Sequence, residues 1–166
     1  MPLLLDDFST SDGAAWRLFT DQVMGGVSMG QAAIAEVQGR RALRLTGTVS
    51  LERNGGFVQV ARPLARNGQA SFDATAFAGL AVQACGAPGR YFVHLRTTDT
   101  RAPWQYYAAP LAVTAGWTDL VIPWPAFVHK ALSTPLDVTR LLRIGVVAAG
   151  AAFEADVAVA SVAFVP

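Results

Sequence analysis

The sequence predicts an all-β chain folded as an antiparallel β-sandwich. Many short segments alternate between apolar and polar residues, turn-forming residues separate them at short intervals, and no long amphipathic helix pattern is present. The clearest alternation lies in 42–51, where Leu43, Leu45, Val49 and Leu51 are predicted to share the buried face. Without an internal repeat or linker, we expect one domain over residues 1–166.

The strands are expected where apolar alternation is bounded by Gly, Pro, Asn or Asp. In chain order they are 3–5, 16–20, 33–38, 42–51, 57–61, 80–85, 91–98, 105–113, 117–122, 144–149 and 156–165. Two hairpins are predicted, one across Gly39-Arg40 and one joining 105–113 to 117–122 across Ala115-Gly116.

Irregular segments are expected between some of these strands. Pro123 and Pro125 cannot donate ladder hydrogen bonds, so they predict an irregular crossing after 117–122. Asp137 is expected to cap a single helical turn that ends near Leu142. Phe72 and Phe77 are predicted to cover the core from a loop.

Two Gly-Gly loops form the most distinctive feature of the sequence. The first runs from Asp21 to Ser28 and contains Met24, Gly25 and Gly26; the second is Asn54-Gly55-Gly56-Phe57. Glycine permits a positive φ and a close backbone approach. Two interpretations apply: an anion-binding nest of backbone N–H groups, or a structural turn in which the Asp21 carboxylate satisfies buried amides. We favour the structural turn.

These motifs, with Trp16, carry a resemblance to a known family. Later pieces fit in the same order: Gly89-Arg90-Tyr91, the strand at Trp117 leading to 123–127, and the strands after Arg143. The chain resembles the complex I intermediate-associated protein 30 family. This resemblance implies a galactose-binding-like jelly-roll β-sandwich. In eukaryotes such proteins assist assembly of the membrane-bound respiratory NADH dehydrogenase, and no catalytic residues are established for them.

The chain departs from the family pattern in three places. Arg53-Asn54 stands for a doubled asparagine, and Gly86-Ala87-Pro88-Gly89-Arg90 replaces a Gly-Asp-Gly-Arg turn. An arginine-glycine pair is missing near His129-Lys130-Ala131, which removes a candidate partner contact.

Composition excludes several classes of protein. The net charge of +1 provides no field for nucleic acid, and the hydrophobic fraction of 52% excludes disorder. Cys85 is the only cysteine, so no intramolecular disulfide is possible, and we expect it to be buried and inert. No apolar run suits a transmembrane helix or a signal peptide, so a cytoplasmic location is expected.

No catalytic constellation is found in the sequence. His94 and His129 lie outside any metal-binding spacing, and no nucleophile elbow or complete phosphate-binding loop is present. We therefore expect no enzymatic activity and no cofactor. Galactose-binding-like sandwiches often carry a structural calcium near the chain ends, and the weak candidate ligands here are Asp6, Asp7, Glu154 and Asp156.

The predicted strand 91–98 carries the candidate binding face. Phe92, His94 and Arg96 are predicted to share one face of this strand, opposite Tyr91, Val93 and Leu95, and an aromatic strand follows. The candidate residues are Arg90, His94, Arg96, Trp104 and Tyr106. Aromatic residues and arginine are enriched at interface hot spots. The alternative is an ordinary outward sheet face on which arginine stacks over an aromatic ring.

The leading functional hypothesis is a non-enzymatic protein-interaction or assembly module. Its partner would be a protein, which the family resemblance suggests could be a subunit or intermediate of respiratory complex I. The alternative is a carbohydrate-binding module with a glycan ligand on the same scaffold, and an enzyme of unrecognised type is a third hypothesis.

Overall fold

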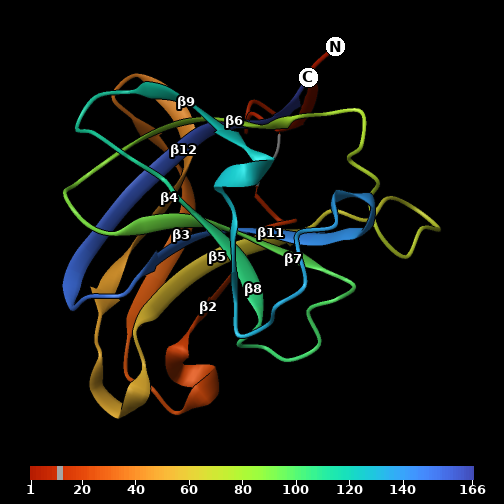
Figure 1. Ribbon diagram of the computed structural model, residues 1–166. Helices are drawn as coiled ribbons and strands as arrows, with labels where there is room; N and C mark the ends of the chain where they lie inside the picture. Colours follow the sequence, from red (N-terminus) through yellow and green to blue (C-terminus); the bar gives the residue numbers. More distant parts are fainter. Residues whose placement is uncertain (11–12) are drawn as a thin grey trace.

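The computed structural model describes residues 1–10 and 13–166 and confirms the predicted jelly-roll β-sandwich (Figure 1). The first sheet has the order β3-β4-β12-β6-β9, and β1 also pairs with β12. Its strands are β1 (Leu3–Asp6), β3 (Met29–Val37), β4 (Arg40–Val49), β6 (Gly79–Gly86), β9 (Thr118–Pro123) and β12 (Phe153–Val165). All pairings in this sheet are antiparallel.

The second sheet has the order β10-β8-β7-β11-β5-β2 and is also antiparallel. Its strands are β2 (Arg17–Thr20), β5 (Phe57–Pro63), β7 (Tyr91–Thr97), β8 (Tyr106–Pro110), β10 (Val128–Lys130) and β11 (Leu141–Ala149). Short 3-10 turns connect the strands: η1 (Asp21–Met24), η2 (Glu52–Asn54), η3 (Trp124–Ala126) and η4 (Val138–Arg140). No helix in the described part of the chain could cross a membrane.

The core lies between the two sheets and is built by the inward residues of each strand. On β7, Tyr91, Val93 and Leu95 are buried while the residues between them reach the opposite face, as period-two geometry requires. Phe164 of β12 stacks with Phe72 and Phe77, which confirms that these two loop aromatics cover the core.

The chain ends lie side by side because β1 pairs with the end of β12, with Leu3 opposite Phe164 (Figure 1). Cys85 is buried, as predicted, and burial raises the pKa of its thiol. The predicted turn after Asp137 is also confirmed: η4 begins there, and the Asp137 carboxylate accepts a hydrogen bond from the Thr139 N–H.

The predicted hairpin across Ala115-Gly116 is wrong. β8 pairs with β7 and β10 in the second sheet, whereas β9 pairs with β6 in the first. The connection therefore crosses from one sheet to the other. Strand alternation identifies the segments, but the partner of each depends on long-range packing that local turn residues do not encode.

Two further details differ from the sequence prediction. β3 begins at Met29 rather than at residue 33. Gly30 can belong to the strand because it has no Cβ, and a Cβ there would overlap Val58 of the facing sheet. Leu51 is 50% exposed, since β4 ends at Val49 and the chain turns into η2 before Leu51 can reach the core.

Candidate functional site

The two Gly-Gly loops meet at the carboxylate of Asp21, which is completely buried. Asp21 accepts hydrogen bonds from the Ser28 N–H at 2.9 Å and from the Ser28 hydroxyl. It also accepts from the Gly56 N–H at 2.6 Å and, at 3.4 Å, from the Phe57 N–H. One side chain thus ties together both family motifs, as the structural interpretation expects.

Each glycine pair serves this arrangement in two ways. Gly25 (φ 86°) and Gly56 (φ 134°) have the left-handed backbone that favours glycine. Gly26 and Gly55 do not; instead, a Cβ on either residue would overlap the Asp21 side chain. The expectation of positive φ therefore holds for one glycine of each pair, and close approach explains the other.

The electrostatics of Asp21 are those of a satisfied structural carboxylate. Burial alone would raise the pKa of Asp21, but the hydrogen bonds from Ser28, Gly56 and Phe57 outweigh it and lower the pKa. The Ser28 hydroxyl also accepts from the Ser50 N–H at 2.9 Å, which links the loops to the end of β4.

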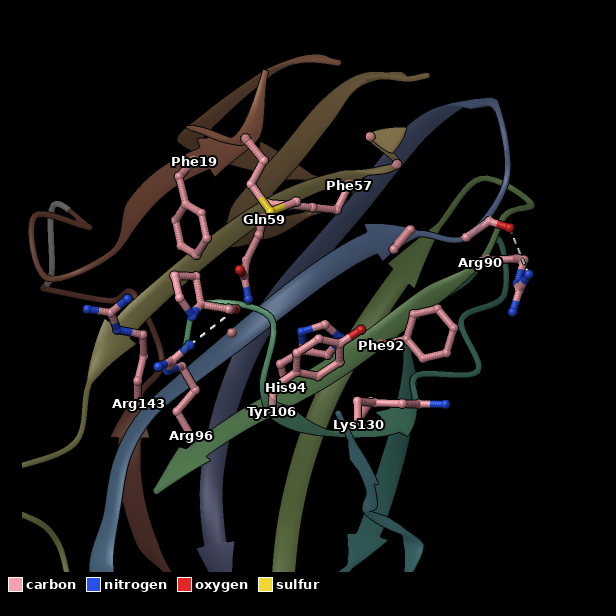
Figure 2. A pocket seen from close by; sticks show the side chains of 18 of the residues that line it. Phe19, Phe57, Gln59, Arg90, Phe92, His94, Arg96, Tyr106, Lys130 and Arg143 are labelled. Carbon is pink, nitrogen blue, oxygen red and sulfur yellow. Dashed lines mark hydrogen bonds between the residues drawn. The ribbon is translucent and has the colours of Figure 1, made fainter. Parts of the chain in front are cut away.

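A hollow of about 770 Å³ opens on the outer face of the second sheet (Figure 2). It extends from Phe19 on β2 to Lys130 on β10. Its middle is formed by small residues: Gly145 of β11 lies level with His94 of β7, and His94 lies level with Ala108 of β8. Because these small residues leave space, larger neighbours form the walls.

The His94–Tyr106 stack lies at the centre of the hollow (Figure 2). The two ring centroids are 4.0 Å apart and the planes differ by 16°. Burial, with a smaller contribution from Lys130, lowers the pKa of His94 to about 3. His94 is therefore a neutral imidazole at physiological pH, and it can both donate and accept a hydrogen bond.

The other predicted site residues occupy the edges of the hollow. Arg96 donates hydrogen bonds to the carbonyls of Thr100, Ala102 and Pro103, so its guanidinium holds the 99–103 loop. Arg90 lies over the Phe92 ring and donates to the Gly150 carbonyl at 2.9 Å. Trp104 is 62% exposed and is not among the residues that line the hollow.

The family-motif loops border the same hollow. Met24, Asn54, Gly55, Gly56 and Phe57 contribute to its lining, while Asp21 lies buried behind them. The structure therefore connects two features that the sequence left separate, the Gly-Gly loops and the face of β7.

The weak calcium candidates do not converge. Asp6 accepts from the Phe8 N–H and the Trp16 indole, and Asp7 accepts from Ser9. Asp156 forms a bidentate ion pair with Arg44 on the first sheet, and Glu154 accepts from a threonine there. Within residues 1–10 and 13–166, no group of three or more His, Cys, Asp or Glu residues is placed to hold a metal ion.

Several lining residues were not identified from the sequence. They come from strands distant along the chain: Phe19, Gln59, Lys130 and Arg143. Phe92 was recognised only as a member of the outward face. A glycine inside the apolar run of β11 is one signal that could have been used, since Gly145 leaves the space into which the Gln59 amide extends.

Solved structures similar to this chain include carbohydrate-binding modules and, over about a quarter of their length, two agarases. A family 11 module of the cellulosomal cellulase Lic26A-Cel5E of Clostridium thermocellum is 13% identical, with a TM-score of 0.79, and the match covers 99% of this chain and 94% of that one. A family 11 module from the same organism, in complex with a β-1,3-1,4-mixed-linked tetrasaccharide, is 12% identical, with a TM-score of 0.77 and coverages of 99% and 95%.

A family 30 carbohydrate-binding module is 12% identical, with a TM-score of 0.63 and coverages of 99% and 87%. At these identities the likeness concerns the fold alone. No curated protein matches the sequence. The model of one protein family matches residues 7–155, the segment that contains both Gly-Gly loops and all of the residues that line the hollow. The chain belongs to the complex I intermediate-associated protein 30 (CIA30) family.

Proposed function

We propose that this chain is a non-enzymatic assembly or interaction module that holds a protein partner in the hollow of the second sheet. The family description supports a role alongside assembly intermediates of respiratory complex I. The observation that carries the proposal is a concentration of unused recognition groups. Within the described residues, the side chains of Gln59, His94, Tyr106, Lys130 and Arg143 line the hollow and make no hydrogen bond or ion pair.

Unused groups of this kind support binding for an energetic reason. Folded proteins usually satisfy their buried polar groups internally. Here a half-buried imidazole and the nearly buried Gln59 side chain face open space beside aromatic rings. A partner that supplies hydrogen bonds to them would bind in a partly desolvated site, where such bonds are worth more than at an exposed surface.

The proposal gives each of the five residues predicted from the sequence a part in binding. His94 and Tyr106 would form the base of the site, and Arg90 and Arg96 would shape its edges through the carbonyls that they bind. Trp104, exposed beside the 99–103 loop, would extend the contact area beyond the hollow.

Carbohydrate binding is the second candidate function. It is favoured by the aromatic rings of Phe92 and Tyr106 next to uncharged hydrogen-bonding groups, Gln59 and the neutral His94. Such a combination suits sugar rings, whose apolar faces pack on aromatic side chains while their hydroxyls need donors and acceptors. The carbohydrate-binding modules of the same fold agree with this candidate.

The proposal is tested with a variant in which a larger side chain fills the hollow. Ala108 is small and lies level with His94, so Ala108→Trp should fill the centre of the site. Val121→Trp, at a 69% exposed position on β9 of the other sheet, is the matched control. Both variants and the wild type are used for affinity capture from the native cell and for a glycan array, after melting curves establish that they fold.

Capture of respiratory-complex subunits by the wild type and the control, but not by Ala108→Trp, is the expected result. Glycan binding with the same dependence would instead establish the second candidate. Equal capture by all three proteins would place the partner site elsewhere. Arg96→Ala and Trp104→Ala test the edges in the same assay, with an expected loss of roughly thirtyfold for a true anchor.

A further inference from the structure

The hollow is much more positively charged than the chain as a whole. Five of the 13 basic residues line it, Arg90, Arg96, Arg101, Lys130 and Arg143, although the chain as a whole has a net charge of only +1. None of the described residues that line it is Asp or Glu. Like charges gathered without a counter-charge repel one another, so an anionic ligand would gain from all of them.

Two of these cations lie on strands of the sheet, are exposed and are uncommitted. Within the described residues, Arg143 and Lys130 form no ion pair and no side-chain hydrogen bond. Arg143 lies level with Arg96 in the adjacent strand; burial is the main cause of the lowered pKa of Arg96, and repulsion from Arg143 lowers it further. Arg90 and Arg96 are already bound to carbonyls, and Arg101, also exposed, lies in the loop between β7 and β8, so Arg143 and Lys130 are the principal free charges on the strands themselves.

The strand order gives the distance between these two charges. Arg143 is on β11 and Lys130 on β10, with β7 and β8 between them, so three strand spacings of about 4.8 Å separate their positions by roughly 14 Å. Figure 2 shows Arg96 and Arg143 on one side of the His94–Tyr106 stack and Lys130 on the other. The neutral stack therefore lies between two cationic ends.

An extended peptide fits this spacing. It rises about 3.3 Å per residue, so four residues span about 13 Å, and positions i and i+4 lie on the same face. We propose that the hollow binds an acidic segment of the protein partner, which crosses the strands in an extended conformation with two carboxylates four residues apart. One carboxylate meets Arg143 beside Arg96, and the other meets Lys130. This inference rests on the proposed function of the hollow.

The peptide test compares spacing and charge separately. Three fluorescein-labelled decapeptides of Ser, Thr and Gly carry Glu at positions 4 and 8, Glu at positions 4 and 7, or Gln at positions 4 and 8. Binding is measured by fluorescence polarisation at about 20 mM salt, where the screening length of roughly 20 Å exceeds the span between the charges. The first peptide should bind at least about tenfold more tightly than the other two.

Charge-reversal variants locate the binding. Arg143→Glu and Lys130→Glu should each weaken binding of the first peptide by about tenfold or more. Arg40→Glu makes the same change in net charge on β4 of the other sheet, where Arg40 lies over Trp117, and it should leave binding unchanged. Melting curves verify that each variant folds.

The outcomes separate this inference from the proposed function. Equal binding of all three peptides, or an Arg40→Glu effect as large as the others, would overturn it. Binding of oligogalacturonate or of neutral oligosaccharide, with none of the peptides, would overturn it in favour of a glycan ligand. If Ala108→Trp abolishes capture of the partner while Arg143→Glu and Lys130→Glu do not, the hollow is the partner site but its ligand is not acidic.

Discussion

Removal of the Asp21 carboxylate is the most direct test of how the two Gly-Gly loops are held. Asp21→Ala deletes the acceptor of three short hydrogen bonds and leaves the N–H groups of Ser28 and Gly56 without it. Hydrogen bonds to a charged group contribute about 1.5–3 kcal/mol each, and a stranded buried donor costs about 1–3 kcal/mol. Since the losses overlap, we expect a total of about 3–5 kcal/mol in the free energy of unfolding.

The assay is thermal unfolding. For a chain of this length, 1 kcal/mol corresponds to about 2–4 °C, so Asp21→Ala should melt roughly 6–20 °C below the wild type. Asp21→Asn retains one acceptor oxygen, so its melting temperature should lie between those of Asp21→Ala and the wild type. Asp119→Ala is the control, because the Asp119 carboxylate is exposed on β9 and, among residues 1–10 and 13–166, accepts a hydrogen bond only from Gln83. That variant should melt within about 2 °C of the wild type.

The pH dependence of this stabilisation has a definite sign. Folding lowers the pKa of Asp21 below its ordinary value of 3.8. The unfolded state therefore binds the proton more readily, and the contribution of Asp21 is complete above that value and is lost as the pH falls through the lowered folded pKa. An Asp21→Ala protein that melts with the wild type at neutral pH but loses partner capture would refute the structural interpretation and make the loops a ligand site.

Three further predictions concern neighbouring features. Gly25→Val should lower the free energy of unfolding by about 1–3 kcal/mol, because residue 25 has a left-handed backbone. Gly55→Val should lower it by about as much, because the new side chain would overlap the Asp21 carboxylate. Denaturant titration measures both variants, and unchanged midpoints would contradict the geometry. Because the pKa of His94 falls to about 3 on folding, the wild type should lose about 2 kcal/mol in the free energy of unfolding between pH 7 and 5, while His94→Gln should lose less; denaturant titration at the two pH values measures both. Arg96→Lys should raise hydrogen exchange in the 99–103 loop, since an ammonium cannot reproduce the forked contacts to three carbonyls; unaltered exchange would mean that these bonds do not hold the loop.

The sequence was sufficient to predict the fold class and the orientation of single strands. On β7 the alternation correctly placed Val93 inward and His94 outward, because period two is a local property of an extended chain. It could not predict which strands pair. The residues around Ala115-Gly116 resemble a hairpin turn, yet β8 and β9 belong to different sheets, and this choice depends on packing over the whole domain.

The same distinction explains why only part of the site was found. His94 and Tyr106 are 12 positions apart in the sequence, and both lie close to one candidate strand. Gln59 and Arg143 come from β5 and β11, and nothing local marks them as neighbours of His94. An outward polar residue on a strand is the ordinary pattern of a solvated sheet face. The functional arrangement arises only from the order of strands in the second sheet.

The position of the family motifs relative to the hollow suggests a division of roles. Asp21 and Ser28 are fully buried, and within the described residues their side chains bind only backbone groups and each other, so they fix the loops from behind the hollow. Met24 and Asn54, in the same loops, are exposed and line the hollow. A rigid support of this kind holds the lining residues in place without itself deciding the charge of the hollow. Substitution of Asp21 should therefore lower stability and weaken binding, because the Gly-Gly loops that border the hollow would shift. Substitution of Arg143 should weaken binding without a change in stability.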